Sequence, residues 1–312
     1  MSLGRALELA ERGRGTAYPN PVVGAVVTRD GIVVGEGWHE RKGEAHAEVR
    51  ALEQAGESAR GAVLYVTMEP CIHPGTTPPC VDAVLAAGIA KVVAGSNDPH
   101  PGHGGGLERL AAAGVETELV DSFASRALNE AWRTWAAESR PFVIFKVAIT
   151  LDGRVAVPGE RWISGEEARR RVHELRAEVD AVAVGMGTVR ADAPRLTARD
   201  VEATTQPRRL AFGRGPLPPD SQLELRSGAL EDELTMLADE GVQSLLLEGG
   251  PTLAASFLRE GFVDKLMLFV APRIAGAGPV LFGELPTPIE LHRLRAERVG
   301  EDVLLTAYIH EP

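Results

Sequence analysis

Short apolar runs and helical periodicities alternate along the first half of the chain. The apolar runs are rich in β-branched residues and predict strands, whereas apolar residues three or four positions apart predict helices. The predicted strands cover residues 22–28, 32–34, 62–67, 90–94 and 115–119, and the predicted helices cover residues 3–10, 46–54, 80–87, 107–113 and 122–138. Asp30-Gly31 separates the first two strands and is typical of a hairpin turn. Strands that alternate with helices indicate an α/β sheet covered by helices.

A second α/β pattern begins directly after Ser139-Arg140-Pro141. Its predicted strands cover residues 142–149, 180–185, 210–213, 244–247, 265–270 and 303–309, and its predicted helices cover residues 166–177 and 252–259. Residues 214–220 are rich in glycine and proline and predict an exposed loop. A chain of 312 residues suits two domains of ordinary size, which we expect at residues 1–139 and 140–312.

Composition narrows the class of protein. Hydrophobic residues make up 44% of the chain, enough for a core in each domain. No apolar run reaches the roughly eighteen residues that span a bilayer, and the start of the chain lacks the pattern of a secretory signal. The formal net charge of −11 argues against a nucleic-acid partner, because binding a phosphate backbone requires a basic surface. We therefore expect a globular cytoplasmic protein without membrane or nucleic-acid partners.

His46, Cys71 and Cys80 together form a candidate metal site. One imidazole and two thiolates suit Zn²⁺, and three protein ligands leave a fourth position open, as catalytic zinc sites require. Glu48 is two residues from the histidine, where it can take a proton from a metal-activated water and pass it on. Zinc deaminases combine these groups to hydrolyse an exocyclic amine. The pattern therefore predicts a zinc deaminase with Glu48 as its catalytic residue.

A structural explanation of the same residues is also open. Two cysteines in a chain of this length can be inert core thiols, and an isolated His-x-Glu is common by chance. Both cysteines nevertheless fall in one short window, each directly follows a proline, and the His-x-Glu precedes them. This combination favours the metal site. With both cysteines assigned to metal, no disulfide is expected, which agrees with a reducing compartment.

Glu248-Gly249-Gly250-Pro251 is a candidate phosphate-binding turn in the second half. It lies between a predicted strand and a predicted helix, where glycines allow close approach and the helix N-terminus offers free N–H groups. The chain lacks the glycine patterns of a standard dinucleotide-binding fold or a P-loop. Gly104-Gly105-Gly106 is interpreted as a turn that leads into a helix. From residue type alone, Trp162 is interpreted as a packing residue and most arginines as solvated surface.

Several longer motifs in the first half carry a resemblance to a known family. They are Pro19-Asn20-Pro21-Val22-Val23-Gly24, Gly37-Trp38-His39-Glu40, His46-Ala47-Glu48-Val49, Glu69-Pro70-Cys71-Ile72-His73 and Thr77-Pro78-Pro79-Cys80. Together they resemble the deaminase half of the bifunctional riboflavin-biosynthesis deaminase-reductases. Eight residues separate the two cysteines, whereas cytidine and tRNA adenosine deaminases typically use Cys-x-x-Cys. The resemblance implies a cytidine-deaminase-like, three-layer α/β/α domain in which Asn20, His39 and His73 position the pyrimidine and its sugar.

The second half resembles the reductase half of the same family. Its matching motifs are Arg140-Pro141-Phe142-Val143, Lys146-Val147-Ala148, Leu151-Asp152-Gly153, Trp162-Ile163-Ser164, His173-Glu174-Leu175-Arg176-Ala177, Gly187-Thr188-Val189, Pro194-Arg195-Leu196-Thr197-Ala198-Arg199 and Glu248-Gly249-Gly250. The resemblance implies a dihydrofolate-reductase-like α/β domain that uses NADPH. The residues that would line the cofactor are Ala148, Trp162, Thr188, Asp192, Gly250, Pro251, Thr252, Leu253, Ala254, Ala255 and Ser256. The residues that would contact the ribityl-phosphate substrate are Arg176, Leu196, Arg199 and Glu248, with Lys146 close by.

Two successive reactions on small phosphoribosyl-pyrimidines follow from the resemblance. The first hydrolyses the exocyclic amine of 2,5-diamino-6-(5-phosphoribosylamino)pyrimidin-4-one to give the uracil. The second transfers a hydride from NADPH to C1′ of the opened ribose and produces a ribityl chain. The family also suggests a homo-oligomer.

The chain departs from the family pattern at several places. Thr76 stands where the family usually has Lys or Arg, and Asp192 is followed by Ala193 in place of a second aspartate. The usual Gly-Glu-Ser-x-Trp is shortened to Gly159-Glu160-Arg161-Trp162, and residues 214–230 are expected to have lost a strand and loop. Two other functions therefore stay open: a deaminase whose second domain serves as a binding or assembly module, and a nucleic-acid base deaminase. The negative charge, the cysteine spacing and the reductase-like half count against the latter.

Overall fold

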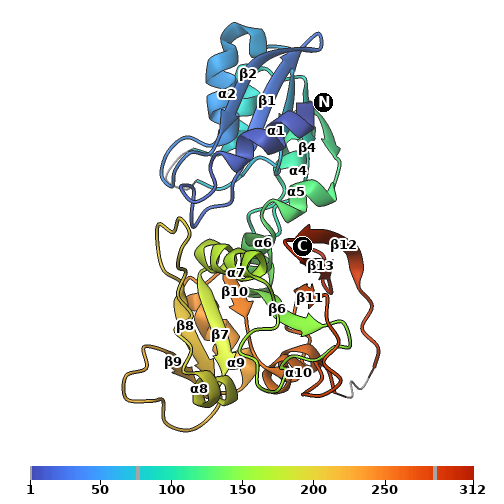
Figure 1. The fold of residues 1–312 in the computed structure, drawn as a ribbon. Coiled ribbons are helices and arrows are strands. Elements are labelled where there is room, and N and C mark those ends of the chain that lie inside the picture. Colours follow the sequence, from blue (N-terminus) through green and yellow to red (C-terminus); the bar gives the residue numbers. More distant parts are fainter. Residues whose placement is uncertain (1, 75–77, 284–286) are drawn as a thin grey trace. The chain divides into compact units, whose positions relative to one another are not determined.

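The structure is a computed structural model that describes residues 2–74, 78–283 and 287–312. The chain divides into two compact units, Met1–Glu138 together with Pro312, and Ser139–Glu311 (Figure 1). Among the described residues, no helix is both long enough and apolar enough to cross a membrane. Thr76, one of the departures from the family pattern, lies outside the described residues.

A five-stranded sheet forms the centre of the first unit, with strand order β2-β1-β3-β4-β5. Its strands are β1 (Gly24–Arg29), β2 (Ile32–Trp38), β3 (Val63–Val66), β4 (Lys91–Ala94) and β5 (Glu116–Leu119). β1 is antiparallel to both of its neighbours, and β3, β4 and β5 run parallel. Asp30 and Gly31 join β1 to β2 with φ angles of 51° and 79°, which are the left-handed values that a two-residue hairpin turn requires.

Helices cover both faces of this sheet. They are α1 (Ser2–Glu11), α2 (Ala47–Ala55), α3 (Cys80–Ala87), α4 (Gly106–Ala112), α5 (Phe123–Ala127) and α6 (Glu130–Glu138), with a 3₁₀ turn at Gly56–Ala59. Ala25 and Val27 of β1 belong to a core shared with α2, α3 and α4, whereas Val26 packs with Ala6 and Leu9 of α1. Successive side chains of a strand point to opposite faces. The unit therefore has three layers, α/β/α.

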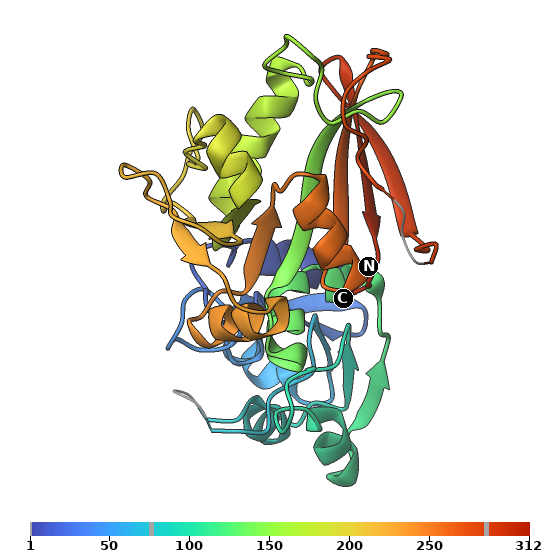
Figure 2. The ribbon, with the colours of Figure 1, turned by 90° about the horizontal axis from the view of Figure 1, so that it is seen from below.

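An eight-stranded sheet forms the centre of the second unit, with strand order β12-β13-β11-β6-β10-β7-β8-β9. Its strands are β6 (Phe142–Thr150), β7 (Ala181–Gly185), β8 (Arg208–Phe212), β9 (Glu224–Arg226), β10 (Ser244–Leu247), β11 (Lys265–Ala271), β12 (His292–Val299) and β13 (Asp302–Tyr308). Six neighbouring strands of this sheet run parallel, namely β11, β6, β10, β7, β8 and β9. Beyond β11, the strands β13 and β12 extend the sheet, and each is antiparallel to its neighbour. Figure 2 shows the long strands β6, β11, β13 and β12, green to dark red, side by side.

The helices of the second unit are α7 (Glu166–Glu178), α8 (Met186–Asp192), α9 (Leu230–Asp239) and α10 (Pro251–Arg259). Leu237 of α9 and Phe257 of α10 share a core with Val143 and Leu245 of the sheet. The chain passes from β6 through α7 to β7 in one direction across the sheet and returns through α9 and α10 in the other. Because crossovers between parallel strands are right-handed, α7 lies on the face opposite to α9 and α10.

Most of the predicted elements are observed, and the differences have local causes. The structure adds α8, α9, β9 and β12; α8 and β9 are too short for a clear periodicity, and β12 is exposed along almost its whole length, so it has no apolar run. The predicted helix at residues 122–138 is wrong as a single element, because α5 and α6 are separate helices. Residues 214–220 are largely exposed, as predicted, and residues 214–230 still provide the edge strand β9.

A buried ion pair fixes the start of the second unit. Arg140 donates one hydrogen bond of 2.8 Å to each carboxylate oxygen of Asp264, and the backbone N–H of Val143 donates another at 2.7 Å. Burial by itself raises the pKa of the Asp264 carboxyl, but the hydrogen bonds from Arg140 and His310 outweigh burial and hold the pKa below its ordinary value. The pair ties the first residues of β6 to the residue that precedes β11.

We predict that Asp264→Ala lowers the free energy of unfolding of the second unit by about 3–5 kcal/mol, because it leaves Arg140 buried without its carboxylate. The stabilisation is present at neutral pH and lost as the pH falls through the folded pKa, since folding lowers this pKa. Urea unfolding of the purified variants measures the change. Glu311→Ala, which removes an exposed pair with Arg293, is the control and should cost less than about 1 kcal/mol. Equal losses in the two variants would contradict the prediction.

Candidate functional site

Three side chains from separate segments meet in the first unit. His46 directly precedes α2, Cys71 lies in the loop after β3, and Cys80 is the first residue of α3. Their ligand atoms all lie within 4.8 Å of one another. Nδ1 of His46 is 3.2 Å from Sγ of Cys80 and 3.6 Å from Sγ of Cys71. Cys80 therefore lies at a helix N-terminus, whereas Cys71 lies in a loop.

The chemistry of this donor set fits zinc. The hydrogen bond between the two sulfur atoms lowers the pKa of Cys71 and raises the pKa of Cys80, so one sulfur is readily present as thiolate. The backbone N–H of Cys80 also donates to Sγ of Cys71 at 3.3 Å. Among the described residues, no fourth His, Cys, Asp or Glu joins the cluster. Three ligands suit a tetrahedral ion with one open position, which is the arrangement of catalytic zinc sites.

Glu48 lies in the first turn of α2, beside this cluster but not part of it. Its side chain is buried, with 3% of the residue exposed. Burial raises the pKa of the Glu48 carboxyl to about 7. A carboxyl with this pKa can both accept and release a proton near neutral pH, which suits a proton carrier better than a metal ligand.

Asn20 and His39, two of the predicted substrate residues, contact each other. Nδ2 of Asn20 lies 3.2 Å from Nε2 of His39, and Nδ1 of His39 lies 3.4 Å from the carbonyl oxygen of Ala45. Burial lowers the pKa of His39, so its ring is neutral and can accept from Asn20 while it donates to Ala45. The ring meets that of His46 edge to face, with centroids 5.2 Å apart. The predicted pair therefore lies directly beside the metal cluster.

His73, the third predicted substrate residue, belongs to a stack of imidazoles. Its ring lies 3.8 Å from the ring of His103, which in turn lies 3.7 Å from the ring of His100. Among the described residues, Nδ1 of His73 is buried without a hydrogen-bond partner. Sequence reasoning missed His100 and His103, although both lie in the proline- and glycine-rich stretch that precedes the glycine run at 104–106.

Two of the three glycines at residues 104–106 occupy positions that favour glycine. Gly105 directly precedes α4 with a φ of 100°, so its interpretation as a turn that leads into a helix is confirmed. A Cβ on Gly106 would lie 1.8 Å from the carbonyl oxygen of Pro70, which only glycine avoids. The carboxylate of Glu69 accepts the N–H groups of Asp98 and Leu107 at 2.9 and 3.4 Å. Together these contacts hold the loop that carries Cys71.

Asn129 is another residue that sequence reasoning missed. This buried side chain accepts the N–H of Val22 at 2.8 Å and donates to its carbonyl oxygen at 2.9 Å. Val22 is two residues from Asn20, so Asn129 fixes the segment that carries a predicted substrate contact. Asn129 lies between α5 and α6, where residues 122–138 divide into two helices.

In the second unit, Glu248 binds two of the predicted substrate residues. Its carboxylate oxygens accept hydrogen bonds of 2.6 and 2.9 Å from Arg176, and Nζ of Lys146 lies 3.6 Å from one of them. Burial raises the pKa of the Glu248 carboxyl, but Lys146 and Arg176 outweigh burial and hold it below its ordinary value. Burial lowers the pKa of Lys146. Arg176 is thus a functional candidate on structural grounds and is not one of the solvated surface arginines.

The remaining predicted substrate residues lie in the segment after α8. Leu196 is buried with a φ of 53°, and Arg199 is exposed. Thr197 lies between Leu196 and Arg199 in the sequence, and its carbonyl oxygen accepts a hydrogen bond of 3.2 Å from the guanidinium group of Arg176. The structure therefore brings Lys146, Arg176 and Glu248 together and connects them to this segment.

The predicted cofactor turn from Gly250 to Ser256 forms the N-terminal part of α10, with Gly250 directly before the helix. β10 and β7 are adjacent parallel strands, so α10 and α8 begin at the same edge of the sheet. A Cβ on Gly250 would lie 3.8 Å from Oγ1 of Thr188 in α8. Free N–H groups at a helix N-terminus bind phosphate groups, and α10 offers them next to Thr188.

Three other predicted cofactor residues lie in different settings. Ala148 is half-buried in β6, opposite Phe269 of β11. Asp192 is the exposed last residue of α8. Trp162 is 55% exposed, with the guanidinium groups of Arg161 and Arg169 at 5.1 and 5.4 Å from its ring. Its interpretation as a packing residue is wrong, and an exposed aromatic ring flanked by cations suits a stacking contact.

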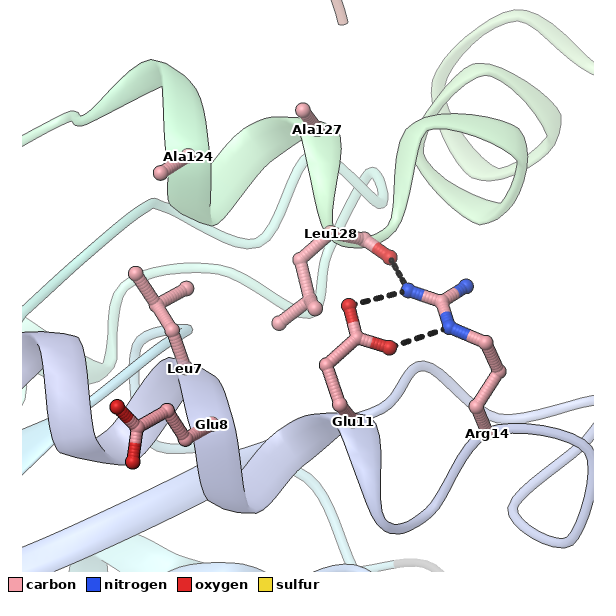
Figure 3. Close-up of a pocket in the computed structure, with 7 residues that line it drawn as sticks. All are labelled: Leu7, Glu8, Glu11, Arg14, Ala124, Ala127 and Leu128. Carbon is pink, nitrogen blue, oxygen red and sulfur yellow. Dashed lines mark hydrogen bonds and ion pairs between the residues drawn. The ribbon is translucent and has the colours of Figure 1, made fainter. Parts of the chain in front are cut away.

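Figure 3 shows a depression of about 410 Å³ in the first unit. It opens between α1 and α5 and is lined by Leu7, Glu8, Glu11, Arg14, Ala124, Ala127 and Leu128. Arg14 forms an ion pair with Glu11 and donates to the carbonyl oxygen of Leu128 at 3.4 Å. No predicted site residue lines this depression, so we assign it no part in the chemistry.

Comparisons with known proteins cover both units. Residues 141–305 match the family model of the RibD C-terminal domain, and residues 2–96 match that of the cytidine and deoxycytidylate deaminase zinc-binding region. The riboflavin biosynthesis protein RibD of Aquifex aeolicus is 39% identical over 345 aligned positions, which cover 96% of this chain and 95% of that protein.

Solved structures agree with these matches. RibD of Acinetobacter baumannii is 33% identical, with a TM-score of 0.84 over 98% of this chain and 97% of that one. A structure from Thermotoga maritima, described as a diaminohydroxyphosphoribosylaminopyrimidine deaminase/5-amino-6-(5-phosphoribosylamino)uracil reductase, is also 33% identical, with a TM-score of 0.82 and the same coverage.

The matches extend over the whole length of the chain and confirm the predicted fold classes, a cytidine-deaminase-like domain followed by a dihydrofolate-reductase-like domain. They also confirm zinc and NADPH as the cofactors and favour a bifunctional enzyme over a deaminase with a degenerate second domain. The chain belongs to the RibD family of riboflavin biosynthesis proteins.

Proposed function

We propose that the chain deaminates 2,5-diamino-6-(5-phosphoribosylamino)pyrimidin-4-one and then reduces the product, 5-amino-6-(5-phosphoribosylamino)uracil, with NADPH. The observation that carries this proposal is the presence of two chemically different sites in one chain. One combines a His/Cys/Cys cluster with a buried glutamate, and the other combines Lys146, Arg176 and Glu248 with a glycine-rich helix start.

In the first step, we propose that His46, Cys71 and Cys80 hold the zinc ion. Zinc supplies a water activated for attack at neutral pH. Glu48 would carry a proton from the attacking water to the departing ammonia, for which a pKa of about 7 is well suited. Asn20, His39 and His73 orient the pyrimidine and its sugar beside the cluster.

In the second step, the N–H groups of Thr252 and Leu253 in the first turn of α10 would bind the diphosphate of NADPH, since Pro251 has no N–H and that of Ala254 donates to Gly250. The rest of the turn from Gly250 to Ser256 would line the cofactor. Ala148, Trp162, Thr188 and Asp192 complete the cofactor site. NADPH supplies the hydride that C1′ of the opened ribose accepts. Arg176, Leu196, Arg199 and Glu248 bind the ribityl-phosphate part, and the lowered pKa of Lys146 suits this lysine to hold or release a proton nearby.

We further propose domain limits of 1–139 for the deaminase and 140–312 for the reductase, and a cytoplasmic homo-oligomer. Two free cysteines support a reducing compartment. The net charge of −11 opposes a nucleic-acid partner.

The two-step function predicts that the purified, zinc-loaded protein releases ammonia from the diaminopyrimidinone phosphate and oxidises NADPH in the same anaerobic cuvette. Glu48→Gln should lose both signals, because it removes the proton carrier of the first step. Adding the deaminated product should restore NADPH oxidation to this variant. Ammonia release without NADPH oxidation, even with added deaminated product, would leave only the deaminase half of the proposal.

The zinc assignment predicts that Cys71→Ser lowers the metal content from about one zinc per chain to well below it, since a serine hydroxyl is a poor zinc ligand. Elemental analysis measures the content. Glu48→Gln is the matched control: it should keep its zinc while losing deamination. Full zinc occupancy in Cys71→Ser would remove this cysteine from the ligand set.

The reductase assignment predicts that Glu248→Gln lowers the kcat/KM of NADPH oxidation at least about a hundredfold, because the buried Arg176 and Lys146 lose their counter-charge. Ammonia release should not change. Glu260→Gln, at an exposed position after α10, serves as the matched control and should leave both activities intact. If Glu248→Gln has the same reductase kinetics as wild type, the assignment of Glu248 to the substrate site is wrong.

A further inference from the structure

Two side chains of α7 reach the same backbone carbonyl. His173 and Arg176 are three residues apart and therefore lie on one face of the helix. Nη1 of Arg176 donates to the carbonyl oxygen of Thr197 at 3.2 Å, and Nδ1 of His173 lies 3.1 Å from the same oxygen. The proposed function gives Arg176 a role and leaves His173 without one.

The segment that these side chains hold has a strained backbone. Leu196 has a φ of 53°, in the left-handed region that is unfavourable for a residue with a branched side chain of this size. Gln206 hydrogen-bonds the N–H and the carbonyl of Ala198 at 2.9 and 3.0 Å on one side. On the other side, the N–H of Arg199 lies 3.3 Å from Nδ1 of His173. His173 and Gln206 thus form a clamp on the turn from Leu196 to Arg199.

The two contacts of Nδ1 require opposite protonation states of this nitrogen. With a proton, Nδ1 donates to the carbonyl of Thr197; without one, it accepts from the N–H of Arg199. A neutral ring can make either contact, whereas an imidazolium can only donate. The charged groups that face the ring are Arg176, Arg199 and Glu248; burial, followed by the two guanidinium groups, lowers the pKa of His173 and keeps the ring neutral near pH 7.

Arg199 is the cation whose position this clamp controls. Its guanidinium group is exposed and donates to Oγ1 of Thr197 at 2.7 Å. Within the described part of the chain, no carboxylate forms an ion pair with Arg199, whereas Arg176 is neutralised by Glu248. Arg199 therefore offers an uncompensated charge to an anionic ligand.

We propose that His173 is a positioning residue of the reductase: it holds the Leu196–Arg199 turn so that Arg199 meets the phosphate of the substrate. This inference rests on the proposed function of the second unit. His173 acts through the turn and contacts neither substrate nor cofactor. Its loss therefore affects substrate binding more than the hydride transfer itself.

The test compares His173→Ala with His173→Asn, because the amide of asparagine reaches the position of Nδ1 and can donate or accept. We expect His173→Ala to lower the kcat/KM for 5-amino-6-(5-phosphoribosylamino)uracil about ten- to hundredfold, mainly through a higher KM. His173→Asn should restore most of this loss. Ammonia release by the first unit and the thermal unfolding of the second unit are measured on the same samples, and His292→Ala, an exposed histidine of β12, should behave as wild type.

The pH profile gives a second readout. Wild-type kcat/KM should fall relative to that of His173→Asn as the pH is lowered through the pKa of His173, because the imidazolium cannot accept from Arg199. If wild type oxidises NADPH and His173→Ala matches it, the inference fails while the proposed function stands. If His173→Asn is as impaired as His173→Ala and both unfold at lower temperature, His173 has only a structural role and the inference also fails. Absence of NADPH oxidation in wild type would overturn the proposed function itself.

Discussion

In both units the chain leaves a set of parallel strands at one edge of the sheet and begins a helix there. β1 is antiparallel to β2 and to β3, so β2, β3 and β4 run in the same direction and end at the same edge. His46 follows β2 and Cys71 follows β3, while Asn20 precedes the antiparallel β1 and therefore lies at that edge as well. Residues far apart in the sequence meet because strand direction brings their segments together, as in other α/β folds. In the second unit, Thr188 after β7 and Gly250 after β10 meet for the same reason.

The two buried glutamates show how the surroundings set the charge of one residue type. Burial acts in the same direction on Glu48 and Glu248, since it disfavours a carboxylate in each. Beside Glu248, the side chains of Lys146 and Arg176 outweigh burial, so the carboxylate stays charged and serves as a fixed counter-ion. Burial dominates at Glu48, which can exchange a proton near neutral pH. In the proposed function, one unit thus uses a glutamate as a proton carrier, whereas the glutamate of the other unit holds two cations.

Part of the fold and of the sites could be predicted because the information was local. Hydrophobic periodicity located most strands, and Asp30-Gly31 located the first hairpin, since both depend on residues next to one another in the sequence. The spacing of His46, Glu48, Cys71 and Cys80 indicated a metal site because few other chemistries use these residue types together. α8 and β12 could not be found in this way, since α8 is short, and β12 is exposed along almost its whole length and takes its hydrogen bonds from β13.

By itself, the sequence determined the identity of the groups that can do chemistry: the donor set for zinc, the glutamate beside it, and the glycine-rich helix start in the second half. Only the tertiary structure decided which groups share a site and in what state of charge. The stack of His73, His103 and His100, the pairing of Arg176 with Glu248, and the clamp of His173 on the turn before Arg199 all join segments that are distant in the sequence. Burial and the partners that it brings set their pKa values and their hydrogen bonds, and neither can be derived from residue type alone.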